Sequence, residues 1–283
     1  MGGSGAAATL GRRLLRELGQ VVRCVLVTRS LTYPRILWHV LSKPRFRSGT
    51  VRFPFGRVRY VDAMSLRNTY MQLFVERVYD VTGLGTTPTI VDCGGNIGLS
   101  VIAFKRRYPR ARIMVFEPDP NIVRTLAANI QALGVEDVEV LPLAVAAAAS
   151  SVTFLPDGAD GGHIVAAGAP DGIPGAIAVR AVPLSEHIRA PVDLLKLDVE
   201  GSEYDIIADL CQSGRIALVR ALICELHGNP DVQARFAQLW EQLTQEGFRL
   251  SLRYARHGAS KPRPPFVVIP GVYFAVHLYA WRP

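Results

Sequence analysis

The chain is predicted to be an α/β protein with a doubly wound, mostly parallel β-sheet. Three apolar runs, near residues 89–92, 112–117 and 193–198, each end in acidic or glycine-rich residues. Stretches with helical periodicity alternate with these runs, as repeated βα units require. In open α/β sheets ligands bind at the carboxyl ends of the strands, so these endings predict a binding site at one sheet edge.

The size and charge of the chain predict one large domain with a basic extension. At 283 residues and 49% hydrophobic composition, the chain can bury a full core. Residues 1–87 carry 14 Lys and Arg against 4 Asp and Glu, a net charge of +10, whereas the remainder carries 18 against 20, a net of −2. We therefore expect an N-terminal extension over 1–87 and a ligand-binding domain over 88–283.

The extension is predicted to contain a helix, a hairpin and a second helix. Apolar residues recur at helical spacing from Leu10 to Leu26 while arginines occupy other faces, which indicates a basic amphipathic helix. Residues 49–61 alternate apolar and polar side chains around Gly56, which is typical of a β-hairpin. Residues 65–80 have the pattern of a helix. The first helix could lie on an anionic membrane, although a cap on the main domain is the commoner use of such a helix.

The domain that follows alternates strands and helices. Strands are expected near 89–92, 112–117, 138–143, 193–198 and 219–226, and helices near 97–107, 120–133, 202–212 and 230–246. Strands near 248–253 and 271–280 are expected to close the sheet as a C-terminal antiparallel hairpin at its edge.

An insertion interrupts this regular alternation. Residues 151–155 and 177–182 have the pattern of a strand pair, and the segment 156–176 between them is rich in Gly and Pro. A loop of this length inside a compact domain is usually functional or disordered. His163 in this loop is either a substrate contact or an ordinary exposed imidazole.

Composition disfavours several classes of protein. No segment approaches the ~20 apolar residues of a membrane span. The four cysteines form neither a CxxC pair nor a disulfide framework, which is typical of a reducing compartment. The basic residues are scattered and no Cys/His finger spacing occurs, which argues against nucleic acid as a partner. We expect a cytoplasmic protein, with peripheral contact with an anionic membrane left open for the basic extension.

The first chemistry-bearing motif is Asp92-Cys-Gly-Gly-Asn-Ile-Gly98. Its small residues let a strand turn sharply into a helix, so that backbone N–H groups would face a ligand. The glycine spacing differs from the GxGxxG of dinucleotide sites. An acid at the strand end would repel a pyrophosphate and suits a cationic ligand such as S-adenosylmethionine, which has an ammonium, a sulfonium and no phosphate. The alternative is a tight βα turn without a ligand.

Glu117 ends the second strand of the domain. At that place a carboxylate accepts hydrogen bonds from both hydroxyls of a ribose. NAD and S-adenosylmethionine both carry this ribose, so Glu117 alone does not separate them. The alternative is a charge that favours the N-terminus of the next helix.

Two pairs of polar residues follow the next strands: Asp198 with Glu200, and Glu225 with His227. Each pair is spaced i, i+2, so its members point to one side of their strand. On neighbouring strands the four groups could converge beside the cofactor and act as a general base. One alternative is a satisfied buried network with Lys196 or with loop N–H groups. Another is a divalent metal, which is disfavoured because nothing in the sequence sets a ligand spacing.

These motifs resemble those of the FkbM family of S-adenosylmethionine-dependent methyltransferases. The resemblance covers about residues 88–230 and rests on Ile90–Gly98, Val115–Asp119 and Asp193–Glu203, of which the last is the most specific. The family usually has Ala where Gly95 stands. The resemblance implies a class I methyltransferase fold, which is a Rossmann-like seven-stranded sheet with one antiparallel strand. It also implies O-methylation, typically of sugar or polyketide hydroxyls.

The resemblance also assigns residues by position. The cofactor-binding part of the motif is matched by Asp92, Gly94, Asn96, Gly98 and Glu117, and the signature after the fourth strand by Asp198, Glu200 and Glu203. The expected acceptor is the hydroxyl of a sugar, glycoconjugate or polyketide-like small molecule. His227 and Asp198 are the candidate bases, Glu200 is expected to shape the acceptor pocket, and loop 156–176 is expected to close over it.

The sequence alone leaves three alternative functions open. A NAD-dependent oxidoreductase could use the same topology, but the glycine spacing disfavours it. A non-catalytic member of the fold could use the basic helix to dock on a membrane or a partner. N-methylation or protein methylation would need the same donor and a different acceptor.

Overall fold

The computed structural model describes residues 3–159, 161–165, 172–228, 232–254 and 274–283. Its centre is a seven-stranded sheet with the strand order β12-β13-β11-β10-β3-β4-β5. These strands are β3 (Thr89–Cys93), β4 (Arg112–Phe116), β5 (Val138–Leu141), β10 (Leu194–Leu197), β11 (Ala221–Gly228), β12 (Arg249–Tyr254) and β13 (Phe274–Trp281). Only β13 runs antiparallel to its neighbours within this sheet. The expected seven-stranded, mostly parallel sheet with one antiparallel strand and a C-terminal hairpin at its edge is confirmed.

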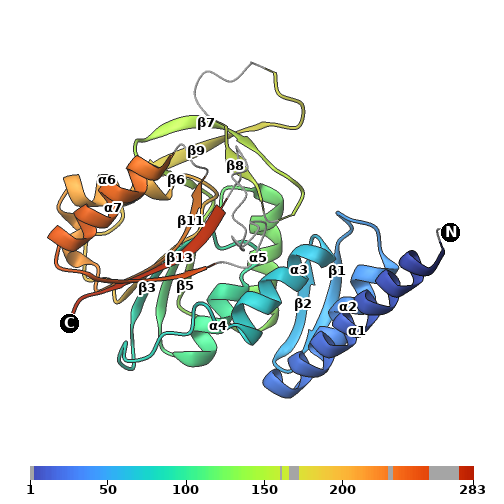
Figure 1. Ribbon diagram of the computed structural model, residues 1–283. Helices are drawn as coiled ribbons and strands as arrows, with labels where there is room; N and C mark the ends of the chain where they lie inside the picture. Colours follow the sequence, from blue (N-terminus) through green and yellow to red (C-terminus); the bar gives the residue numbers. More distant parts are fainter. Residues whose placement is uncertain (1–2, 160, 166–171, 229–231, 255–273) are drawn as a thin grey trace.

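Helices cover both faces of the sheet (Figure 1). They are α4 (Leu99–Arg107), α5 (Pro120–Ala132), α6 (Glu203–Gln212) and α7 (Gln233–Gln245). Successive side chains of a strand point to opposite faces of the sheet and pack in different hydrophobic clusters. Ile90 packs with residues of α4 and α5, and Val91 packs with residues of α6 and α7. Because both faces are covered, the central strands carry apolar residues on both sides rather than alternating, apart from the buried pair Asp92 and Lys196.

The N-terminal extension packs on the face that carries α4 and α5. It consists of α1 (Gly3–Thr28), α2 (Thr32–Ser42), β1 (Gly49–Phe53), β2 (Gly56–Tyr60), α3 (Ala63–Tyr70) and a π-helical turn, η1 (Met71–Val75). The expected first helix and hairpin are present, while α2 was not expected. The helix expected over 65–80 ends earlier, because the chain widens into η1 and leaves helical structure after it.

Buried side chains of the extension and of the sheet form one continuous core. Tyr33, Val58 and Tyr70 belong to the same apolar cluster as Ile90 and Ile102. A domain boundary at residue 88 stays a prediction, since burial on this scale couples the extension to the sheet. Among the described residues, no helix combines the length and the apolar character needed to cross a membrane.

The insertion forms a second, smaller sheet. Its strands are β6 (Ala144–Ala146), β7 (Ser150–Leu155), β8 (His163–Ile164) and β9 (Ile177–Pro183), in the order β6-β9-β7-β8. The expected strand pair corresponds to β7 and β9. Residues 160 and 166–171 of the expected loop lie outside the described residues. The described part places His163 in β8, exposed to solvent.

Candidate functional site

A cavity of about 320 Å³ lies at the carboxyl ends of the central strands. Segments far apart in the sequence line it: the glycine loop after β3, the ends of β4, β10 and β11, and the α3–η1 segment of the extension. The insertion adds part of the wall through Phe154 of β7, Ile164 of β8 and Asp157 between these strands. The predicted edge of the sheet therefore does carry a pocket large enough for a small ligand.

The glycine loop brings β3 into contact with the end of β10. Gly94 has a φ of +83°, and a Cβ atom added to it would lie 1.8 Å from the carbonyl oxygen of Asp198. Only glycine allows this approach. Gly98, with a φ of +86°, begins α4 at its N-cap and does not line the cavity. The two glycines thus shape the loop, while Gly94 and Asn96 form part of the cavity wall.

The backbone N–H groups of this loop are used inside the protein. Those of Gly94 and Gly95 both donate to the carbonyl oxygen of Phe116, at 3.0 and 2.9 Å. The N–H of Asn96 donates to Oε2 of Glu117 at 2.9 Å. The expectation that these N–H groups face a ligand is therefore wrong, because β4 supplies their acceptors.

Glu117 is buried at the cavity wall. Besides the bond from Asn96, its Oε1 accepts a hydrogen bond from the N–H of Asp119 at 3.0 Å. Burial raises the pKa of Glu117 to about 7, although both backbone donors oppose the shift. Each carboxylate oxygen can accept a second hydrogen bond, so Glu117 can hold the loop and still receive ribose hydroxyls. Asp119 caps α5 by accepting a hydrogen bond from the N–H of Asn121. The N-terminus of this helix therefore has a capping carboxylate other than Glu117.

Asp92 lies beneath the cavity rather than in its wall. It is fully buried, and Lys196 Nζ lies 2.9 Å from its Oδ1. Ser100 donates a hydrogen bond to its Oδ2. Lys196 also donates to the carbonyl oxygen of Gly94 at 2.6 Å, so this ion pair ties the glycine loop to β10. Burial lowers the pKa of Lys196, but the charges of Asp92 and Asp198 raise it by more, and the ammonium stays charged.

Asp198 faces the cavity at the end of β10. Its Oδ2 accepts a hydrogen bond from the hydroxyl of Tyr79 at 3.0 Å and lies 3.9 Å from Lys196 Nζ. Burial, together with the charges of Asp198 and Glu225, raises the pKa of Tyr79 well above its ordinary value, so the phenol keeps its proton and donates. The carboxylate is therefore oriented by two neighbours while its side chain is still 23% exposed to the cavity.

His227 lies between carboxylates on β11. Its Nδ1 is 2.8 Å from Oε1 of Glu203, and its Nε2 is 3.6 Å from Glu200 and 3.8 Å from Glu225. Burial alone would lower the pKa of His227, but the hydrogen bond and charge of Glu203, with the other carboxylates, raise it to about 10. Both ring nitrogens are thus directed at acids, and Glu203, from the start of α6, orients the ring.

Glu200 completes the group in a strained conformation. Its φ is +56°, in the left-handed region that residues other than glycine rarely adopt. Burial, opposed in part by His227, raises the pKa of Glu200 to about 8. Such strain is often held at functional sites, where the surrounding structure enforces it.

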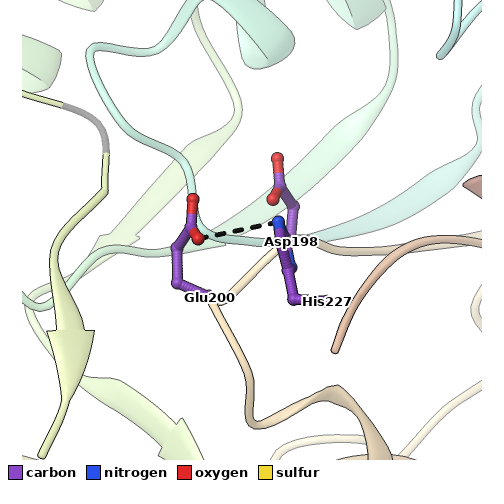
Figure 2. Close-up of side chains that lie close together, drawn as sticks. All are labelled: Asp198, Glu200 and His227. Carbon is purple, nitrogen blue, oxygen red and sulfur yellow. Dashed lines mark ion pairs between the residues drawn. The ribbon is translucent and has the colours of Figure 1, made fainter. Parts of the chain in front are cut away.

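The predicted convergence of Asp198, Glu200 and His227 is present (Figure 2). Each offers one ligand-type atom, and these atoms lie within 4.8 Å of one another. Two carboxylates and an imidazole can hold a divalent cation. No spacing along the sequence marks these residues as metal ligands, and they come together only because β10 and β11 are neighbours in the sheet. Glu225, the fourth group expected to converge, also lines the cavity: its Oε1 lies 3.8 Å from Nε2 of His227. Its Oε2 accepts a hydrogen bond from Gln72 and lies 3.0 Å from Nε2 of His277.

The extension contributes cavity residues that the sequence did not predict. Tyr79 follows η1, and Asn68, Thr69 and Gln72 line the cavity from α3 and η1. No spacing or motif marked them, because only the packing of the extension on the sheet brings them to the site.

Comparisons with known proteins agree with the motifs. Residues 92–250 match the family described as Methyltransferase FkbM domain. Methyltransferase 1 of Beauveria bassiana is 26% identical over 205 residues, which is 65% of this chain and 81% of that protein. Methyltransferase sdnD of Sordaria araneosa is 43% identical over 61 residues, 22% of this chain and 24% of that protein. The chain thus matches only about a quarter of the length of sdnD.

Among solved structures, a methyltransferase FkbM from Methylobacillus flagellatus has a TM-score of 0.49 at 14% identity, covering 96% of this chain and 60% of that one. M. jannaschii TYW2, solved in complex with AdoMet, has a TM-score of 0.47 at 11% identity, and the match covers 85% of this chain and 89% of that one. The family match spans more than half of this chain, and the family implies S-adenosylmethionine as methyl donor. The chain therefore belongs to the FkbM methyltransferase domain family.

Proposed function

We propose that the protein transfers the methyl group of S-adenosylmethionine to a hydroxyl of a sugar, glycoconjugate or polyketide-like small molecule. The observation that carries this proposal is the carboxylate of Asp198, which is oriented by Tyr79 and faces the cavity beside the glycine loop. A hydroxyl acceptor must lose a proton during transfer, and a carboxylate within hydrogen-bond reach can take it. Amide and hydroxyl groups of Asn68, Thr69 and Gln72 in the wall suit an acceptor with several hydroxyls.

The residues present fit the methyl donor. Glu117 offers buried acceptor oxygens at the cavity wall for the ribose, and the acids of the site favour a cationic ligand. When bound, S-adenosylmethionine supplies a methyl group already activated by its sulfonium. The protein therefore has to position the acceptor and remove its proton, and positioning supplies much of the rate.

We assign the proton acceptor to Asp198 rather than His227. Both residues line the cavity, but Glu203 and the other carboxylates raise the pKa of His227 to about 10, so its ring is already protonated near neutral pH, whereas Asp198 offers a carboxylate. In this assignment the acceptor oxygen forms a bond to the methyl carbon while its proton passes to Asp198. Tyr79 keeps the receiving carboxylate oriented, and His227 holds the chain end of β11 against α6.

The test measures methyl transfer to a panel of hydroxyl acceptors, with mass spectrometry and NMR to locate the new methyl group. Asp198→Asn is expected to lower kcat by about 10²- to 10⁴-fold, the usual contribution of a general base, with the affinity for S-adenosylhomocysteine unchanged. Asp205→Asn, on the exposed side of α6, is the matched control and is expected to keep full activity.

Three outcomes would overturn parts of the proposal. Full turnover by Asp198→Asn would show that Asp198 is not the proton acceptor, and full turnover by His227→Ala as well would exclude both candidate bases. A new methyl group on nitrogen would exclude O-methylation, and calorimetric binding of NADH alone would favour an oxidoreductase. Assays with EDTA and then with added Mg²⁺ or Mn²⁺ report whether the Asp198, Glu200 and His227 group works through a cation.

We also propose that the protein acts in the cytoplasm. All four cysteines are free, and three of them are buried, which suits a reducing compartment. Thiol titration of the denatured protein, taken from cells under alkylating conditions, is expected to find four free thiols. A disulfide would contradict this location.

A further inference from the structure

We infer that the outer face of α1 and α2 is a docking surface for an anionic membrane. The inference does not depend on methyl transfer. It starts from four side chains of α1 that point away from the protein: Leu15, Leu18, Val22 and Leu26, here called the apolar stripe. They are 70%, 61%, 57% and 72% exposed. Exposed apolar residues clustered in this way mark interaction sites more often than scattered ones do.

The stripe is continuous because of its spacing. Its members follow one another by three, four and four residues, and at about 100° per residue they stay on one side of the helix. The opposite side packs on the protein: Cys24 is fully buried, with its Sγ 3.5 Å from Sδ of Met71, and Val21 packs against the core. The helix is therefore already held by its inner face, and the outer stripe adds nothing to that packing.

The second helix enlarges the exposed apolar surface. On α2, Trp38 and Leu41 are 69% and 77% exposed. Figure 1 shows α1 and α2 side by side at the end of the molecule remote from α6 and α7. Tryptophan is enriched where one end of a side chain is apolar and the other is wet, as at a membrane surface.

The charge around this surface selects the partner. Residues 15–52 carry eight Lys and Arg and a single acid, Glu17, a net charge of +7. Glu17 is paired with Arg67 at 3.4 Å, whereas Arg23, Arg29 and Arg35 are exposed. A second copy of the chain would bring two strongly positive surfaces together. An apolar stripe flanked by arginines instead suits the interface of a bilayer with anionic headgroups.

The inner side of α1 contacts the segment that leads into the cavity wall. Met71, which α1 contacts through Cys24 and Gln20, begins the η1 turn, and the next residue, Gln72, lines the cavity. In a docked protein, α1 would therefore lie between the bilayer and the segment that lines the cavity.

The test uses the full chain and vesicle co-sedimentation. Vesicles of phosphatidylcholine alone are compared with vesicles in which about a third of the lipid is phosphatidylglycerol. We expect binding only to the anionic vesicles, weakened by added salt because the charges are exposed. The double variant Leu18→Glu with Leu26→Glu is expected to lower the bound-to-free ratio at least about tenfold, because it places two negative charges in the face that would enter the bilayer. Leu252→Glu, at a position 44% exposed on β12, is the matched control and is expected to bind like the unmodified protein.

Independent readouts keep the outcome clear. The emission of Trp38, isolated by comparison with Trp38→Phe, is expected to shift to the blue on anionic vesicles. Thermal unfolding and S-adenosylhomocysteine binding are expected to be unchanged in the double variant, because the stripe contacts neither core nor cavity. No binding, equal binding to both vesicle types, or equal binding by the double variant would overturn the inference. It would also be overturned by a dimer that the double variant converts to a monomer, since the face would then be a protein interface.

Discussion

Substitution of Gly94 by alanine tests the contact that assembles the site. The added Cβ would lie 1.8 Å from the carbonyl oxygen of Asp198, whereas real Cβ atoms essentially never come within 3.0 Å of another heavy atom. The glycine loop and β10 would have to separate by about 1.2 Å, the difference between these distances. The left-handed φ adds about 1–2 kcal/mol of strain, and overpacking typically costs about 1–3 kcal/mol. We expect Gly94→Ala to lower the free energy of unfolding by about 2–5 kcal/mol.

Gly83 provides a matched control. Its φ of +82° equals that of Gly94 within a degree, but nothing lies within 4 Å of an added Cβ. Gly83→Ala therefore carries the strain without the collision and is expected to cost only about 1–2 kcal/mol. Guanidinium unfolding measures both variants, and calorimetry with S-adenosylhomocysteine measures the site.

The two variants are also expected to differ in activity. A shift of about 1 Å at the reacting groups can cost about 10²-fold in rate, so Gly94→Ala is expected to lose turnover while Gly83→Ala keeps it. Equal destabilisation within about 0.5 kcal/mol, with turnover retained by both, would refute the close approach of the loop to Asp198.

Three further perturbations test the supports of the site. Lys196→Met leaves the buried carboxylate of Asp92 without its cation, and guanidinium unfolding is expected to show a loss of about 3–5 kcal/mol; a loss below about 1 kcal/mol would contradict the ion pair. Asn129→Leu removes hydrogen bonds that join Arg59 of the hairpin to the glycine loop, and the same assay is expected to show about 1–3 kcal/mol. Burial raises the pKa of Glu117 to about 7, so its ionised fraction falls about tenfold between pH 8 and pH 6. Calorimetry is expected to show S-adenosylhomocysteine affinity falling with it, and a Glu117→Gln variant with the same pH profile would contradict this role.

The strands of the main sheet could be predicted because their sequences carry their own signal. Buried parallel strands are apolar on both faces, so runs such as 89–92 and 193–198 stand out before any packing is known. Strands β6 and β8, of three and two residues, have no such signal. They exist because β9 and β7 offer hydrogen-bonding partners, which sequence periodicity does not reveal.

Part of the site was predictable in the same way. The i, i+2 spacing of Asp198 and Glu200 predicts one shared side, and strand neighbourhood predicts that His227 joins them. The role of the loop N–H groups was not predictable, because the carbonyl of Phe116 and the carboxylate of Glu117 compete for them only after β3 and β4 pair.

The sequence by itself determined the fold class and the family, because these depend on residue order and local pattern. Tertiary structure decided which groups surround each charged residue: Glu203 beside His227, Lys196 beside Asp92 and Tyr79 beside Asp198. These neighbours set burial, hydrogen bonding and protonation, and the extension that supplies Tyr79 reaches the site only through long-range packing. The chemistry of the site depends on the distances between these residue pairs in the folded protein, and the distances cannot be read from their separation along the sequence.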